Sequence, residues 1–435
     1  MSEATDSPFD TLADRLPAIL LCLLIFSLAF MQPTIPLLGF LAVPTDFIFL
    51  ALAAVWGGLL ILRRTRIIWD PAYAFIGLYF LAMLISVPGS ESPRHSAVKL
   101  FTQLYLFSLP VIVCSLVADE ARLRSAIRAW LIGSAVTAAV AILSLVLFAA
   151  DPASPILQPA LSVKGTLPPG DYPRLQLTFV NANQACNYLT VSLALILAAG
   201  HAGLVSRRPF VLLLVGSLIA CLTTISPGLG GVALFIGLWC WLLWRVRRPA
   251  AASMALTMGV CAAVLFALAM TVTPILHPTA PYLIHVPLLD LTLAPSGRLM
   301  IWTEAVQNFL AHPLTGRGIG IDPVKVHYMD PSHQLETSTD AHNAFLSIAV
   351  QCGIIGLAAF LLLAGHIGKR TSPLRLSEGN PGTMRVGLGI GLLTGLLYEG
   401  LGGSFEDSRH LWVAFGLLLA SNRISRRASE TAALR

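Results

Sequence analysis

Charge is scarce in this chain of 435 residues. Asp, Glu, Lys and Arg make up only 11% of it, whereas 56% of the residues are hydrophobic. A soluble domain carries roughly 25% charged residues and needs them to cover its surface. The composition therefore excludes a water-soluble enzyme, a disordered chain and a nucleic-acid-binding protein. It predicts a multi-pass membrane protein, in which lipid solvates the apolar faces of the helices.

Sequence motifs for several kinds of chemistry are also missing. The seven cysteines are odd in number and form no CxxC pair, so the sequence predicts neither a disulfide framework nor a zinc site. No DxD, HExxH, Walker A, GxSxG or GxGxxG motif occurs. The histidines at 277, 285, 312, 327 and 333 have no recognisable ligand spacing. We therefore expect no metal site and no cofactor.

Long apolar runs dominate what is present. A bilayer needs about 20 apolar residues per helix, and twelve such runs occur, near 16–32, 44–62, 69–88, 98–117, 126–149, 180–200, 209–225, 228–245, 251–273, 342–365, 386–403 and 410–423. With the N-terminus in the cytoplasm, 20 of the 28 Lys and Arg residues lie on the cytoplasmic side. The sequence thus predicts an all-α protein of twelve transmembrane helices with both termini cytoplasmic.

This topology divides the chain into three parts. Residues 1–273 hold helices one to nine, 274–341 form a large periplasmic loop, and 342–435 hold helices ten to twelve with a cytoplasmic tail. Within the loop, Ser296 can cap a helix from Arg298 to Leu310, which Pro313 and Gly316 would end. Its apolar residues have the spacing of an amphipathic helix, so we expect it along the outer membrane interface, over the bundle.

The segment DAHNAFLSIAVQCGIIGL, residues 340–357, opens an apolar helix with the polar pair His342 and Asn343. A histidine at this boundary can act as a general base on a hydroxyl group, and Asn343 can bind substrate. The alternative is a residue at the start of a helix that only hydrogen-bonds a loop.

The segment SGRLMIWTEAVQNFLAHPLTGRGIG, residues 296–320, supplies Arg298, Glu304, Arg317 and a glycine-rich turn. Backbone N–H groups at a helix start, together with a guanidinium, can bind a phosphate-bearing ligand. The alternative for Arg298 is an anchor whose charged end extends to the membrane interface.

Two further polar segments lie on the same predicted face of the membrane. In DYPRLQLTFVNANQACNYL, Arg174 precedes a helix, and Asn181 and Asn183 can bind sugar hydroxyls or cap that helix. In YEGLGGSFEDSRHLW, the candidate substrate-binding residues are Glu399, Asp407 and Arg409. A carboxylate inside a membrane is costly and usually functional, although these exposed charges can also pair with each other.

A histidine, several arginines and a few carboxylates on one face suit a lipid-linked diphosphate. Arginines would neutralise a leaving diphosphate, and a base would activate an incoming hydroxyl. A transporter without chemistry is the alternative of a different class. It would place polar residues at the middle of the bilayer, whereas here they gather at one surface.

Three of these segments resemble a known family. HNAFLSIAVQCGIIGL is similar to the His-Asn-x-x-Leu…Gly-x-x-Gly-Leu element of the O-antigen ligase and O-antigen polymerase superfamily, and SGRLMIW…HPLTGRGIG to its Arg…Trp…Pro-Leu-x-Gly-x-Gly element. FVNANQACNYL resembles its Asn-Pro-Asn element, with Ala182 in place of the proline. The family often carries a Ser-Arg-Gly element near its seventh helix. This sequence departs from it, because Pro227 stands where the arginine would be. Arg174 is a candidate replacement.

The resemblance implies a C-type glycosyltransferase fold in the inner membrane of a Gram-negative bacterium. The donor would be a glycan linked to undecaprenyl diphosphate, and the acceptor the lipid A–core of lipopolysaccharide. By resemblance His342 is the general base, Arg298 and Arg174 hold the diphosphate with Arg317 as a further candidate, and no metal is needed. The polymerase of the same superfamily, which joins lipid-linked repeat units, is the nearest alternative.

Overall fold

The protein is mostly helical in a computed structural model that describes residues 8–37, 40–165, 172–224, 272–274, 284–286, 291–295, 297–329, 335–371, 380–402 and 408–433. Its helices are α1 Pro8–Ser27, α2 Pro44–Ile61, α3 Ala72–Ser86, α4 Pro93–Leu116, α5 Glu120–Ala150, α6 Ala182–His201, α7 Arg207–Thr223, α10 Gly297–Ala311, α11 Ala344–Thr371, α12 Asn380–Gly402 and α13 Arg409–Ala433. The predicted apolar runs that fall within the described residues coincide with α1–α7 and α11–α13. The run at 228–245 and nearly all of that at 251–273 lie outside the described residues.

Within the described ranges, six helical stretches are long and apolar enough to cross a membrane. They are Pro44–Ile61, Ala72–Gly89, Pro93–Leu116, Glu120–Ala150, Ala182–His201 and Ala344–Arg370. Large apolar side chains on these helices remain exposed, such as Leu50, Leu81, Phe101 and Val146, and only lipid can solvate so many of them. The protein is therefore a multi-pass membrane protein, as the composition predicted.

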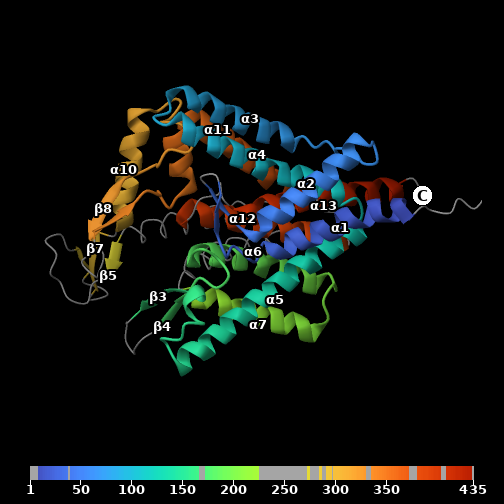
Figure 1. The fold of residues 1–435 in the computed structure, drawn as a ribbon, viewed down its shortest axis with the longest axis horizontal. Coiled ribbons are helices and arrows are strands. Elements are labelled where there is room, and N and C mark those ends of the chain that lie inside the picture. Colours follow the sequence, from blue (N-terminus) through green and yellow to red (C-terminus); the bar gives the residue numbers. More distant parts are fainter. Residues whose placement is uncertain are drawn as a thin grey trace, which may run out of the picture.

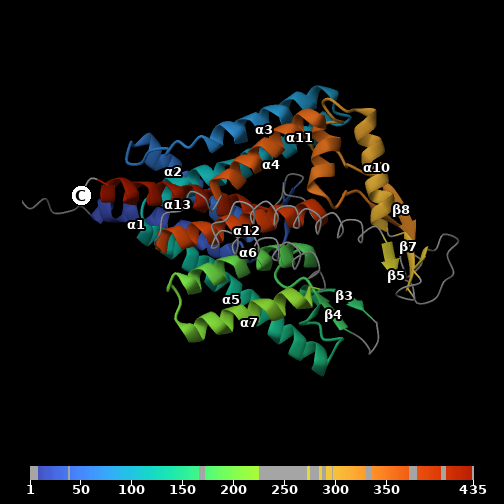
Figure 2. The same cartoon turned by 180° about the vertical axis from the view of Figure 1, so that it is seen from behind.

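The long helices run side by side, and the polar loops gather at one end of the bundle (Figure 1). Helix α10 and the labelled short strands lie at that end, which we call the α10 end, and the chain's C-terminus lies at the other, the C-terminal end (Figure 2). Helix α6 packs against α7 and α12, α4 against α13, and α3 against α11. The two ends of the bundle therefore carry different sets of polar residues.

Helix α12 approaches α6 closely along a stripe of glycines at every fourth position, Gly387, Gly391 and Gly395. A Cβ atom at Gly387 would overlap Ala198 of α6, and one at Gly391 would lie 3.2 Å from Cγ1 of Val191. Between membrane helices such contacts replace the hydrophobic effect, because lipid is as apolar as leucine. The stripe thus explains why these two helices pack along their length.

Short antiparallel strands, which the sequence reasoning did not predict, fold the polar loops. They are β1 Ile35–Leu37, β2 Phe40–Ala42, β3 Leu161–Gly165, β4 Tyr172–Leu175, β5 Val272–Pro274, β6 Ile284–Val286, β7 Leu291–Pro295, β8 Val326–Met329 and β9 Leu335–Ser338. They pair as β1–β2, β3–β4, β5–β7–β6 and β8–β9. Strands of three to five residues are too short for their side-chain alternation to be recognised in sequence. The β8–β9 hairpin leads directly to the start of α11.

The amphipathic helix predicted from Arg298 to Leu310 is α10, and it lies across the end of the bundle (Figure 1). Its Ile301 and Ala305 are buried against Ala341 and Val350, beside the start of α11. Its Leu299, Met300, Val306 and Leu310 remain more than 40% exposed. An exposed apolar stripe of this kind is typical of a helix lying at a membrane interface.

Candidate functional site

Helix α11 is interrupted at Gly353, which has φ +64° and ψ −165°. The interruption separates a short helix, 344–352, from the long one that follows. Four backbone hydrogen bonds fill the gap by joining α11 to the glycine-rich turn after α10. The N–H groups of Arg317, Gly318, Ile354 and Ile355 donate to the carbonyls of Val350 (2.9 Å), Gln351 (3.0 Å), Pro313 (2.8 Å) and Leu314 (3.4 Å).

We call this pairing of residues 313–320 with 350–355 the turn–helix junction. It requires glycine at two positions in particular. Gly353 and Gly316 both have positive φ, and a Cβ atom at either would overlap backbone of the other segment, Leu314 or Gln351. The two sequence elements on which the family resemblance rests therefore contact each other directly. The single apolar helix that we predicted over 342–365 is thus two helices with a glycine between them.

Arg317 ties the junction to the α3–α4 connection. Its Nε and Nη2 donate to the carboxylate of Glu91 at 2.9 and 2.8 Å. Nearby, Ser86 Oγ accepts from the N–H of Ile319 at 3.0 Å, and Ser96 Oγ donates to the carbonyl of the same residue. The structure thus places Arg317, a predicted diphosphate ligand, in an ion pair that holds the turn.

His342 lies directly before α11 in a left-handed conformation, with φ +48°. The carboxylate of Asp340 holds it from two sides, because Oδ1 accepts from the His342 N–H at 3.0 Å and Oδ2 lies 3.4 Å from Nδ1 of the ring. Trp302 of α10 donates from Nε1 to the carbonyl of Ala341 at 3.0 Å. The imidazole is 40% exposed, so it is oriented by the protein and still accessible.

The pKa of Asp340 is lowered although the carboxyl is half-buried. Burial alone raises this pKa, but the hydrogen bonds and charge of His342, together with the charge of Lys99, outweigh it. Asp340 is therefore ionised beside the imidazole. Lys99 is on α4, and its Cβ lies close to Gly320 of the glycine-rich turn.

Arg298 occupies the first turn of α10, within electrostatic reach of the same group. Burial lowers the pKa of its guanidinium, and the charge of Arg174 lowers it further, whereas Tyr398 and Asp340 raise it. The structure therefore brings three predicted residues together, since Arg298 is near Arg174 and near the carboxylate that holds His342. Two half-buried guanidiniums that repel each other favour an anion between them.

Arg174 extends from β4 to the end of α7. Its Nε donates to the carbonyl of Thr224 at 3.2 Å, and its Nη2 donates to Oδ1 of Asn183 at 3.1 Å. Asn181 caps α6, because its Oδ1 accepts from the N–H of Gln184 at 2.8 Å. Pro227, where the family pattern would have an arginine, lies outside the described residues but only three positions after Thr224.

The remaining predicted residues are placed elsewhere or hold local structure. Asn343 caps α11, since its Oδ1 accepts from the N–H groups of Phe345 and Leu346 at 3.0 and 3.2 Å. Glu304 accepts from Asn308 on the same helix at 3.4 Å. Asp407 lies outside the described residues.

Arg409 and Glu399 connect helices. Arg409 forms a two-bond ion pair with Asp46 of α2, at 2.7 and 3.0 Å, and Tyr105 donates to the same carboxylate. Glu399 is buried, and its Oε1 accepts hydrogen bonds from Asn187 of α6 and from Ser408. These residues join α2, α4, α6, α12 and α13 at the α10 end.

Sequence reasoning did not single out Lys99, Asp340 or Tyr398. The sequence does contain a pattern that points to Lys99, because it is one of the eight basic residues that the positive-inside rule leaves on the outer side. A pattern also points to Asp340, since it lies two positions before His342. No sequence pattern pointed to Tyr398, because its nearness to Arg298 arises only when α11 packs against both α10 and α12.

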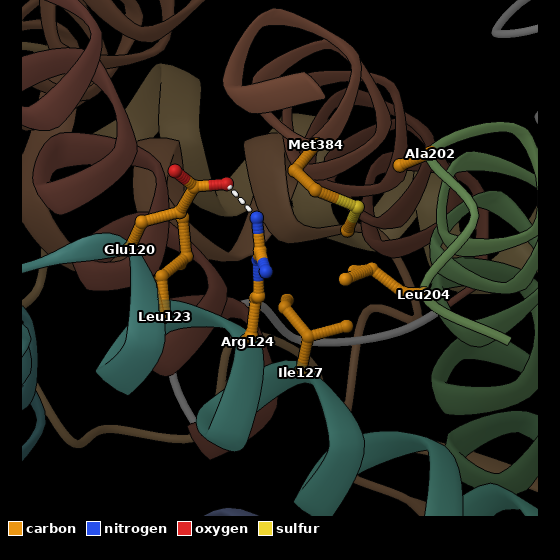
Figure 3. Close-up of a pocket in the computed structure, with 7 residues that line it drawn as sticks. All are labelled: Glu120, Leu123, Arg124, Ile127, Ala202, Leu204 and Met384. Atoms are coloured by element: carbon orange, nitrogen blue, oxygen red, sulfur yellow. Dashed lines mark hydrogen bonds and ion pairs between the residues drawn. The ribbon is translucent and has the colours of Figure 1, made fainter. Parts of the chain in front are cut away.

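One small pocket of the described residues has no room for a substrate. The pocket in Figure 3 lies between the start of α5 and the segment after α6, where Arg124 pairs with Glu120. Its volume is about 10 Å³, which is room for about one water molecule. Within the described ranges, no three His, Cys, Asp or Glu side chains are close enough to hold a metal ion.

A family model described as O-antigen ligase matches residues 210–361. The matched segment contains α10, the glycine-rich turn, His342 and the interruption of α11. No curated protein matches the chain. The matching family covers both O-antigen ligases and polymerases, which are glycosyltransferase-like enzymes that act on lipid-linked sugars. The match supports the O-antigen ligase superfamily over residues 210–361, and it confirms the resemblance predicted from the sequence.

Proposed function

We propose that this protein is an O-antigen ligase of the bacterial inner membrane. It transfers a glycan from an undecaprenyl-diphosphate-linked donor to the lipid A–core of lipopolysaccharide at the periplasmic face. The observation that carries the proposal is the meeting of a His342–Asp340 pair with the half-buried guanidiniums of Arg298 and Arg174. A base and two phosphate-binding cations are what such a transfer needs.

His342 is the general base of the proposed reaction. With Nδ1 directed to Asp340, Nε2 is the ring nitrogen that accepts the proton of the acceptor hydroxyl. The hydroxyl oxygen forms a bond to the anomeric carbon as the bond from that carbon to the diphosphate breaks. The electron pair goes to the diphosphate oxygen, so the products are the glycosylated acceptor and undecaprenyl diphosphate. A single direct displacement inverts the anomeric carbon.

Arg298 and Arg174 stabilise the leaving diphosphate. Their mutual repulsion is relieved when an anion lies between them, and their partial burial strengthens the attraction. Arg174 also lies at the end of α7, where the family pattern has the arginine that this chain lacks. Arg174 is thus supported as the replacement. Because two guanidiniums offset the charge, the proposed reaction needs no metal ion.

The other candidate residues take supporting roles in this proposal. Asn183 positions Arg174 through its 3.1 Å hydrogen bond, and Arg317 positions the glycine-rich turn through Glu91. Arg409 remains a candidate substrate contact at the same end of the bundle, and Asp407 remains a candidate from the sequence alone. Glu399 and Asn187 hold α12 against α6 beneath the site.

The proposed orientation places the α10 end in the periplasm and both termini in the cytoplasm. Single cysteines at positions 298 and 342, labelled with a membrane-impermeant thiol reagent in whole spheroplasts, test it. Both are expected to react from the periplasmic side. Reaction of the two from opposite sides of the membrane would exclude the proposed enzyme.

The reaction is tested with purified protein, a defined undecaprenyl-diphosphate-linked glycan, and lipid A–core as the acceptor. We expect glycosylated lipid A–core to form at the same rate with and without a metal chelator. Product that appears only as longer lipid-linked glycan, with the acceptor unused, would identify a polymerase instead. Movement of intact donor across a vesicle membrane without new glycosidic bonds would identify a transporter.

A further inference from the structure

A second cluster of arginines lies at the C-terminal end of the bundle, opposite His342. A cavity of about 270 Å³ is enclosed there by four elements of the fold. Its charged lining comprises Arg370 of α11, Asp70 before α3, and Arg423, Arg426, Arg427 and Glu430 of α13. The lining thus contains four arginines and two carboxylates, so its net charge is +2.

Two of these arginines are held firmly by the protein. Arg370 donates from Nη1 and Nη2 to the carboxylate of Asp70 at 3.2 and 2.8 Å. Arg423 donates to the last carbonyls of α4, including that of Cys114 at 3.0 Å. These bonds fix the inner wall of the cavity. Arg426 and Arg427 follow within one turn of α13 and are exposed at its mouth.

The edge of the cavity is apolar and exposed. Trp69 lines the cavity and is 71% exposed, and Ile67, two residues before it, is also exposed. Tryptophan is typical of the membrane–water interface, where its ring lies at the level of the headgroups. A soluble anion would gain nothing from this apolar edge, whereas the chains of a lipid would cover it.

We propose that this cavity binds the phosphate headgroup of an anionic phospholipid in the leaflet opposite to His342. The volume is slightly below the range of about 300–1,000 Å³ of sites for drug-sized ligands, and it suits a headgroup. Basic pockets between helices on the cytoplasmic side of membrane proteins bind diphosphatidylglycerol and similar lipids through their phosphates. The proposal is independent of the reaction at the α10 end, because it uses none of the same residues.

Lipid binding is measured by native mass spectrometry of the full-length protein in detergent, with added diphosphatidylglycerol, phosphatidylglycerol or phosphatidylcholine. We expect adducts with the two anionic lipids and few with the zwitterionic one. R426Q/R427Q removes two charges from the mouth of the cavity and should weaken anionic-lipid binding by about tenfold or more. R426K/R427K keeps the charges and should bind with intermediate strength.

The matched control is R207Q/R208Q, which removes two exposed arginines from the start of α7, at the same end of the bundle. It should keep the binding of the wild type. Equal loss in both double variants would overturn the proposal, because it would show diffuse attraction to a basic surface. Unchanged binding by R426Q/R427Q would also overturn the proposal. Displacement of the lipid by inorganic phosphate would overturn it too, because that result would assign the cavity to a soluble anion. The midpoint of thermal unfolding in lipid-free detergent checks the fold, and the single variants R426Q and R427Q give the same comparison if the double variant is unstable.

Discussion

Helix α11 has a histidine near each of its ends, and each histidine belongs to a cluster that contains an aspartate and an arginine. At the α10 end, His342 contacts Asp340 through Nδ1 and is 40% exposed. At the C-terminal end, Nε2 of His366 accepts from Nε of Arg370 at 3.3 Å, and the ring stacks on Phe75 with centroids 4.4 Å apart. Arg370 in turn is bound to Asp70.

The same three residue types therefore give two different environments. The His366 cluster is internally satisfied, because its arginine and aspartate neutralise each other and its ring nitrogen already accepts a hydrogen bond. In the His342 cluster the aspartate holds the histidine, and the arginines, Arg298 and Arg174, repel each other. Two guanidiniums close to each other favour an anion beside His342.

The largest expected effect distinguishes the two histidines. His342→Ala should lower the rate of glycan transfer by about 100-fold or more, because a general base contributes at least that factor. His366→Ala is the control, and it should leave the rate unchanged, since its ring serves only packing and Arg370. Rates with the purified protein and defined donor measure both. Comparable losses in the two variants would remove the distinction and the role of His342 with it.

The junction that holds the α10 end is tested at Gly353. Gly353→Ala forces a side chain into a left-handed conformation and against the carbonyl of Leu314, so it should lower the free energy of unfolding by at least about 2 kcal/mol. Gly365→Ala, in the same helix, has no atom within 4 Å of the new Cβ and should not destabilise. Unfolding in detergent, followed by circular dichroism, measures the difference. Wild-type stability of Gly353→Ala would show that the interruption of α11 is not required.

A smaller effect should separate the arginines. Arg298→Ala should lower the use of donor by about tenfold, and Arg298→Lys by less, because lysine keeps the charge but loses the two-bond geometry of the guanidinium. Arg317→Ala should affect stability more than donor use, because Arg317 is paired with Glu91. The Michaelis constant for the donor and the turnover number are measured for each variant. Equal effects of Arg298→Ala and Arg298→Lys on donor use would indicate that Arg298 is only an interfacial anchor.

Local sequence patterns determined the membrane class, the positions of α1–α7 and α11–α13, the amphipathic helix α10 and the cap at Asn181. Each of these depends on hydropathy or on hydrogen bonds between residues a few positions apart, which the chain order preserves. The order of the family elements also located His342 and Arg298.

Only the tertiary structure decided which charges pair with each other. Asp46 and Arg409 are 363 positions apart, and Asp70 and Arg370 are 300 apart, yet both pairs form two-bond ion pairs. The nearness of Arg174 to Thr224, and of Lys99 to Asp340, likewise depends on how whole helices pack. Electrostatic interactions act through distance in space, so a sequence shows the charges, and the packing of the helices decides which of them neutralise each other.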